Sequence, residues 1–283
     1  MLFDESSRLI TRALCAWSGA PLNDIDTEEM AHDLVAMVDG FASPGRRHLR
    51  ARRARSRQEE RLARLVEAVR NGTEAAPADS VLAAVVAHRD AEGQPLDPHT
   101  AAVEVLNVLR PAVAVTWFLT FAAHALHRWP EHRELLAVGE RGYARAFAHE
   151  VRRFYPFAPF VGGLAADDLL WDGRDSPAGS MVLLDLYGQN HDPDLWPKPY
   201  TFDPGRFVGR EPDRDELVPQ GGGDPATNHR CLGEDLTLTV LETLVPLLAA
   251  YHYDVPDQDL TIPLRRMPTA PRSGFVMTPL PPA

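Results

Sequence analysis

Cysteine is scarce in this sequence, which holds only Cys15 and Cys231 among 283 residues. Two cysteines far apart in the chain exclude a small disulfide scaffold and are typical of a protein kept in a reducing compartment. The N-terminal residues also lack the charged and apolar pattern of a secretory leader. We therefore expect a cytoplasmic protein.

Basic residues are fewer than acidic ones: the sequence has 29 Lys and Arg and 40 Asp and Glu, which gives a net charge of −11. This balance argues against broad binding to nucleic acid or to an acidic membrane surface. The stretch 46–70 is an exception, with ten Arg and three Glu around apolar positions such as Leu62 and Val66. A solvated helix face is the favoured interpretation, and a nucleic-acid or partner surface over residues 46–57 is the alternative.

Long apolar runs are nearly absent. The stretch from Pro111 to His127 has no Asp, Glu, Lys or Arg, but it is short and is interrupted by the proline and two histidines. A membrane span needs about 20 mostly apolar residues. We expect a buried core helix and no membrane span.

Helical periodicity dominates residues 1–155, and short alternating runs among prolines dominate residues 156–283. The fold class expected is mainly α with small β-sheets (α+β), in a single domain over residues 1–283, since no boundary is visible. The expected helices cover 5–18, 27–40, 46–70, 78–90, about 100–128, a short segment after Pro130, 141–154, and a segment after Cys231. Strands and irregular connections are expected around the last of these helices and in the tail.

Three simple motifs are incomplete. His149-Glu150 lacks the second histidine of a zinc-protease helix, and Gly221 to Asp224 lacks the Lys-Ser/Thr ending of a phosphate loop. His124 and His127 share a helix face without an evident third ligand, which favours packing or surface roles.

A glycine-rich stretch, Val218 to Glu234, places Cys231 directly before a helix. A thiol there meets unpaired helix N–H groups and the positive end of the helix dipole, which stabilise a thiolate that can bind a metal. A buried structural cysteine remains the alternative from this segment alone.

Further signals precede this loop. Glu150 and Arg153 are spaced to meet on one helix face, and Arg206 follows in the segment 202–207. Together with the Cys loop, in this order, they resemble the cytochrome P-450 superfamily. The resemblance implies the haem-thiolate fold, with haem b (heme b, iron protoporphyrin IX) bound through Cys231 as the axial ligand of the iron. It also implies a structural triad of Glu150, Arg153 and Arg206.

The same resemblance implies smaller roles for Gln220 and His229, which lie in the Cys loop. Each could contact the haem or its propionates, or could instead hold the backbone of the loop. The segments 154–160, 185–193 and 219–224 narrow the resemblance to the bacterial fatty-acid peroxygenases, also called fatty-acid alpha- or beta-hydroxylases. The sequence starts well inside such enzymes, so the resemblance implies a domain that lacks roughly its N-terminal third. Two interpretations stay open: a fragment of a longer gene product, or a real short product with impaired haem retention.

Arg110 and Pro111 carry the expected chemistry. Most superfamily members have an acid and an alcohol on the helix over the haem, and residues 107–115 contain no such pair. Arg110 instead interrupts an apolar helix, where an unpaired charge is costly, so it needs an anion. Glu104 is a possible structural partner, although its spacing fits poorly.

In the peroxygenase branch the anion is the carboxylate of the substrate, which serves as general acid-base while hydrogen peroxide acts as the oxidant. The resemblance therefore implies fatty-acid hydroxylation without a redox partner, and Pro111 is expected to kink the helix beside Arg110. Two alternatives are a conventional monooxygenase fed by redox partners and an inactive remnant with weak haem binding.

Overall fold

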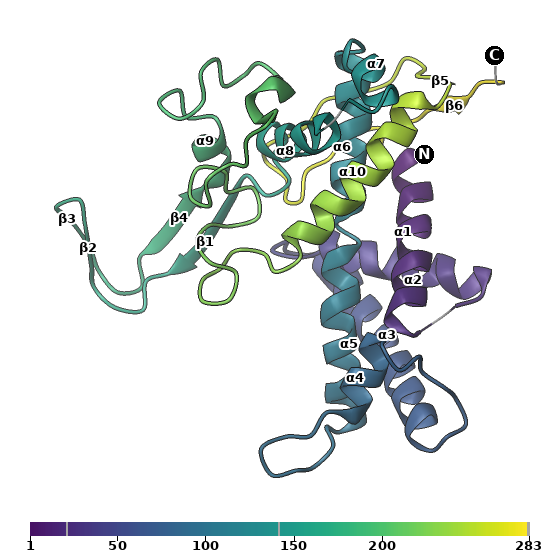
Figure 1. Ribbon diagram of the computed structural model, residues 1–283. Helices are drawn as coiled ribbons and strands as arrows, with labels where there is room; N and C mark the ends of the chain where they lie inside the picture. The colour runs from purple at the N-terminus through teal and green to yellow at the C-terminus, as the bar shows by residue number, and fades with distance from the viewer. Residues whose placement is uncertain (21, 141, 282–283) are drawn as a thin grey trace. The chain divides into compact units, whose positions relative to one another are not determined.

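The computed structural model describes residues 1–20, 22–140 and 142–281 (Figure 1). The chain folds as two compact units. The first comprises Met1–His124, His252–Thr261 and the residues from 271 onward, and the second comprises Ala125–Tyr251 and Ile262–Ala270. The change in composition near residue 156 falls inside the second unit, and the single domain stays a prediction.

The first unit is built from helices, as the periodicity predicts. They are α1 (Leu2–Ser18), α2 (Asp24–Asp39), α3 (Arg46–Arg70), α4 (Val81–Ala87), α5 (Pro98–Ala112) and the start of α6 (Val115–Arg128). The expected helix 78–90 is shorter than predicted. The Ser80 hydroxyl caps it by accepting from the Ala83 N–H at 3.1 Å, and His88 leaves the helical region.

The core of the first unit lies where α3 packs against α2 and α5. Its side chains recur at helical spacing, and four large ones from these helices are at most 1% exposed: Met30, Leu34, Leu62 and Leu109. Burying each such side chain contributes about 1.5–3 kcal/mol. This packing fixes α5 as a rigid support for Arg110.

The expected helix 100–128 is two helices, because α5 ends at Ala112 and α6 begins at Val115. Pro111 has no N–H, and its ring crowds the carbonyl four residues earlier. The bonds just after it tighten: Ala114 N donates to the Pro111 carbonyl at 3.1 Å and Thr116 N to that of Val113 at 3.0 Å. The predicted kink is therefore a short non-helical turn.

Taken together, Pro98–Arg128 forms the one stretch among the described residues with the length and apolarity of a membrane crossing. Two thirds of its most apolar window, 67%, is buried. A core helix passes the same test of length and composition, so the stretch is weak evidence for a membrane span.

The second unit is built around the helix α8 (Tyr143–Phe154). The elements that contact α8 are α7 (His132–Ala137), α9 (Leu186–Asn190), the 3-10 turn η1 (Pro204–Phe207) and α10 (Glu234–Ala250). The expected helix 141–154 begins at Tyr143, after Gly142 in the left-handed region, and Arg141 lies outside the described residues. Helix α8 packs against η1 and α10.

Strands are short and paired in twos. In the second unit β1 (Phe160–Leu164) pairs antiparallel with β4 (Met181–Asp185), and between them β2 (Leu169–Trp171) and β3 (Arg174–Ser176) form a hairpin (Figure 1). Alternation of apolar and polar residues usually indicates a strand with one buried face. In β1, by contrast, all five residues are exposed. The pair β5 (Tyr253–Asp254) and β6 (Thr278–Pro279) belongs to the first unit, and most of the tail is irregular. A mainly helical fold with small sheets is confirmed.

Candidate active site

Cys231 is a free, partly exposed thiol just ahead of α10. Its N–H donates to the Gln220 carbonyl at 2.9 Å, which closes the intervening loop, and its own carbonyl accepts from Glu234 N at 3.3 Å. Gly221 sits at φ +93°, and a Cβ there would stand 2.4 Å from the His229 carbonyl oxygen. Only glycine fits this closure. The thiol is thereby held just before the start of α10.

The predicted triad comes together around Glu150 on α8. Glu150 and Arg153 form a bidentate pair with both bonds at 2.7 Å, and both side chains are buried. Arg206 Nε lies 3.8 Å from Glu150 Oε1, and Arg206 also donates to the Lys198 carbonyl at 2.9 Å. The Glu150 and Arg153 pair is satisfied, because both carboxylate oxygens and all three guanidinium nitrogens have hydrogen-bond partners. The buried Nε of Arg206 has no hydrogen bond among the described residues.

Asn190 connects the triad to the Cys loop. Arg153 Nη1 donates to the Asn190 carbonyl at 2.8 Å, and the Asn190 side-chain oxygen accepts from the backbone N–H of Val218 at 3.1 Å. The triad therefore supports the start of the loop through a single intermediate residue.

Arg152 is a site residue that the sequence reasoning missed. It is fully buried, its Nε donates to Gln220 Oε1 at 2.9 Å, and its Nη2 pairs with Glu234. Gln220 and Glu234 stand on opposite sides of Cys231, so one guanidinium ties both ends of the Cys loop to α8. The available signal was a second arginine directly beside the Glu150 and Arg153 motif.

Gln220 is accordingly a bridging residue. Besides accepting from Arg152, its amide donates to Thr237 Oγ1 on α10 at 3.3 Å. Neither of these bonds is to the loop backbone, and a role toward haem stays a prediction.

His229 is exposed and borders a hollow of about 400 Å³. The rest of the wall comes from the β1 and β4 pair and its neighbours, with apolar side chains such as Val161, Leu164, Val182 and Leu184. His229 has no hydrogen bond from its ring to any described residue, and its predicted contact with haem is untested by this arrangement.

Arg110 belongs to the first unit. Helix α5 is capped at its start by Asp97, which accepts from the N–H groups of His99 and Thr100 at 3.0 Å. Three turns later Arg110 is half-buried, and no hydrogen bond or ion pair joins it to another described residue. The expected alternative partner, Glu104, is exposed and does not pair with it.

The environment of Arg110 disfavours its charge. Burial lowers the pKa of Arg110, and the positive charge of Arg55 lowers it further. A bound anion would favour the charged guanidinium and so offset both effects, as expected at a carboxylate-binding site.

A family profile and several curated proteins match part of this chain. The family profile "Cytochrome P450" matches residues 129–282. A curated relative, Cytochrome P450 4A7 of Oryctolagus cuniculus, is 27% identical over 64% of this chain and 32% of its own length. Another, Cyclooctat-9-en-7-ol 5-monooxygenase of Streptomyces melanosporofaciens, is 34% identical over 38% of this chain and 23% of its own length.

Solved structures match over nearly the whole chain. Cytochrome P450SP alpha in complex with (R)-ibuprophen is 44% identical with a TM-score of 0.89, and the match covers 98% of this chain and 68% of that one. Cytochrome P450EX alpha with myristic acid is 36% identical with a TM-score of 0.88, covering 99% and 69%. The chain belongs to the cytochrome P450 family. It spans about a third of the first curated relatives and about two thirds of these solved chains.

The family implies haem, and the residues present fit it. The donor is the free thiol of Cys231, in a glycine-rich loop whose two ends are anchored. Gly233, two residues on, leaves the space beside the sulfur free of a side chain. Among the described residues no group of three or more His, Cys, Asp and Glu side chains could hold a separate metal ion, so His124 and His127 do not form one.

Proposed function

We propose that this protein hydroxylates fatty acids with hydrogen peroxide as a haem-thiolate enzyme. The observation that carries the proposal is Arg110: a half-buried cation without a partner among the described residues, in a helix segment that lacks the acid and alcohol of other superfamily members. The 44% identity to cytochrome P450SP alpha, and the myristic acid bound to the similar cytochrome P450EX alpha, support this substrate class.

Cys231 would hold the haem iron through its sulfur, with the loop anchored by Arg152 and the triad. Haem held by a thiolate supplies peroxide activation and oxygen transfer to a C–H bond. The anchors at Gln220 and Glu234 would restrict movement of the Cys231 sulfur, because both flanks of the cysteine are fixed to α8.

Arg110 would bind the substrate carboxylate through paired N–H donors. The bound carboxylate then stands in for the missing acidic side chain and can accept and return a proton as a general acid-base. Pro111 would add to this arrangement, because α5 ends just after it, two residues beyond Arg110.

The test is the Arg110→Ala variant assayed with myristate and hydrogen peroxide. Loss of the carboxylate ligand and of its proton transfer should lower turnover by at least about 100-fold, while the spectrum of the thiolate-ligated haem stays unchanged. Arg53→Ala is the matched control, since it removes another arginine of the same unit that is exposed. Retained turnover in Arg110→Ala would contradict the carboxylate role.

A conventional monooxygenase is the second candidate, because one curated relative with 34% identity is named a monooxygenase. The two functions separate by oxidant. Turnover with hydrogen peroxide alone supports the peroxygenase, whereas turnover that requires an electron-donating partner supports the monooxygenase. A protein that shows no thiolate-type spectrum after addition of hemin supports the inactive remnant instead.

A further inference from the structure

The arginines of α3 divide into two groups. Those that face α2 are paired with its acids: Arg57 with Asp33, Arg61 with Asp26 at 2.8 Å, and Arg47 and Arg50 with Asp39 at 3.1 and 3.0 Å. These ion pairs hold α3 on α2. The basic composition of α3 is therefore partly structural.

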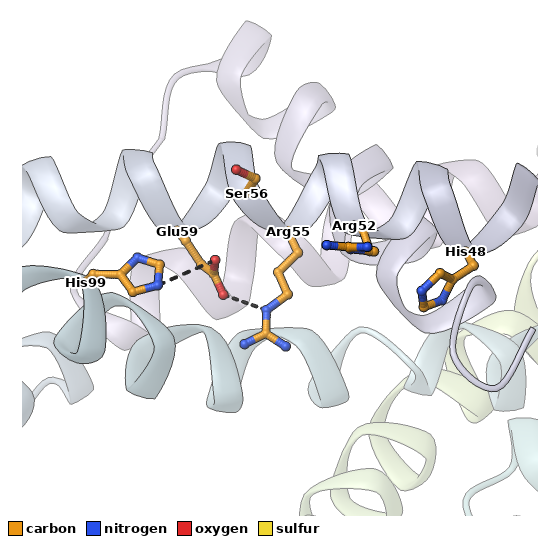
Figure 2. Close-up of a pocket in the computed structure, with 6 residues that line it drawn as sticks. All are labelled: His48, Arg52, Arg55, Ser56, Glu59 and His99. Atoms are coloured by element: carbon orange, nitrogen blue, oxygen red, sulfur yellow. Dashed lines mark hydrogen bonds and ion pairs between the residues drawn. The ribbon is translucent and has the colours of Figure 1, made fainter.

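Another face of α3 borders a groove of about 570 Å³ (Figure 2). Helix α3 contributes a stripe at helical spacing, and the start of α5 contributes one residue. The lining residues are His48, Arg52, Arg55, Ser56, Glu59 and His99. Figure 2 shows Arg55 extending from α3 toward α5, and His99 reaching back toward Glu59.

The groove holds more positive than negative charge. Arg55 Nε donates to Glu59 Oε1 at 2.5 Å, and His99 Nε2 lies 3.9 Å from Glu59 Oε2, so the one acid of the groove is already engaged. Arg52 is exposed and has no hydrogen bond or ion pair to any described residue. The balance is unusual in a protein with a net charge of −11.

The groove and Arg110 lie within electrostatic reach of each other. Helices α3 and α5 pack together, and the charge of Arg55 acts on Arg110. His99 and Arg110 are eleven positions apart on α5, about 16 Å along a helix. Arg55 therefore places positive charge in the groove that also acts on Arg110.

We propose that this groove is a capture site, in which Arg52 and Arg55 attract the carboxylate of the fatty acid before it is passed to Arg110. The inference rests on the proposed function of Arg110. A locally positive surface raises the encounter rate of an anion that the whole molecule repels, and this effect falls steeply with salt. Arg52, which has no acid of its own, contributes most of the attraction, because Glu59 offsets Arg55.

The experiment compares Arg52→Gln with Arg53→Gln in the haem-loaded protein, with myristate as the probe. The two neighbouring arginines are both exposed, and only Arg52 lines the groove. At low ionic strength we expect Arg52→Gln to lower kcat/KM and the association rate of myristate by about threefold, with kcat unchanged. Arg52→Glu should lower them by about tenfold.

Salt supplies the second arm. In about 1 M salt the screening length is about 3 Å, so the difference between Arg52→Gln and the unaltered protein should vanish. Equal losses in Arg52→Gln and Arg53→Gln would overturn the proposal, since they would report the net charge alone. A loss of kcat, or a defect that persists in high salt, would also overturn it.

Two further readouts separate this proposal from others. If Arg52→Gln left myristate association unchanged but abolished salt-dependent binding of a DNA or RNA oligonucleotide, the groove would be a nucleic-acid surface and the capture role would be wrong. If Arg110→Ala kept full turnover, the proposed function would fail. The association rates of the Arg52 and Arg53 variants would still report on the groove.

Discussion

At the scale of single residues, Arg152 and Arg153 on α8 face different structures, because successive helix positions point about 100° apart. Arg153 holds Glu150 and the backbone carbonyls of Asn190 and Pro199. Arg152 holds Gln220 and Glu234 on the two flanks of Cys231. One helix thus supports the Cys loop from two directions with adjacent side chains.

We expect Arg152→Gln to destabilise the protein by about 3 kcal/mol, because it leaves the carboxylate of Glu234 with only Arg230 as its partner in a largely buried site. Urea unfolding measures this loss. The same variant should lose haem faster to apomyoglobin than the unaltered protein does, since the loop flanks are freed.

Arg145→Gln on the same helix is the control. It removes surface pairs with Glu211 and Glu242, which are partly exposed and contribute under about 1 kcal/mol. If the two variants were equally stable and retained haem equally, Arg152 would have no special part in holding the loop.

Sequence reasoning reached the triad and Cys231 but missed Arg152, and the reason is physical. The triad follows from a short spacing, Glu150 to Arg153, that a helix brings together. Arg152 meets Gln220 and Glu234 across 68 and 82 positions of chain, and only tertiary packing determines such a contact. For Arg110, the sequence predicted the cation in an apolar helix, but not that the positive charge of Arg55, on another helix, lowers its pKa further.

At the scale of elements, Pro111 decides where α5 ends. Its substitution by alanine restores a backbone N–H donor and removes the ring that crowds the preceding turn, and proline costs about 3 kcal/mol relative to alanine inside a helix. We expect Pro111→Ala to raise the melting temperature, because α5 and α6 can then join, and to lower fatty-acid turnover, because Arg110 is turned from its present direction.

Pro246, inside α10, is the matched proline. Pro246→Ala should raise stability without a comparable loss of turnover. A Pro111→Ala protein that keeps full turnover would show that the turn after α5 is unimportant for Arg110.

The sequence predicted helices in this part of the chain correctly. It did not predict the boundary at residues 113 and 114, because that boundary depends on local hydrogen bonds that the apolar periodicity does not reveal.

At the scale of the whole molecule, the second unit holds two histidines that resist protonation. Burial lowers the pKa of His149 to about 4, with the charge of Arg152 adding to the effect, and burial also lowers that of His191 to about 4. Arg152 donates to His149 Nδ1 at 3.2 Å, and the ring Nε2 faces Glu211 at 3.2 Å. This arrangement requires the neutral ring, with its proton on Nε2.

Stability should therefore fall in acid. The unfolded chain protonates both rings near pH 6.5 and the folded protein only near pH 4, so below about 6.5 the unfolded state binds more protons. Above that pH the contribution of the two neutral histidines to the free energy of unfolding is fully present. At about pH 5 we expect the free energy of unfolding to be lower by about 2 kcal/mol per histidine. Urea unfolding as a function of pH measures the slope.

His149→Gln should flatten this slope, and His88→Gln, which changes an exposed histidine of the other unit, should leave it unaltered. A protein equally stable at about pH 5 and pH 7 would contradict the burial argument for both rings.

The anchoring of the Cys loop at both ends has a consequence for how this part of the chain can vary. Arg152 holds Gln220 and Glu234, and Cys231 N–H closes onto the Gln220 carbonyl, so the segment between them is a tethered loop. Doubling the length of a flexible loop costs only about 0.6 kcal/mol in closure entropy. Insertions after Gly223 should therefore be tolerated far better than any change at the two tethering points. The length of this loop can then differ between related or engineered proteins while its two ends stay fixed.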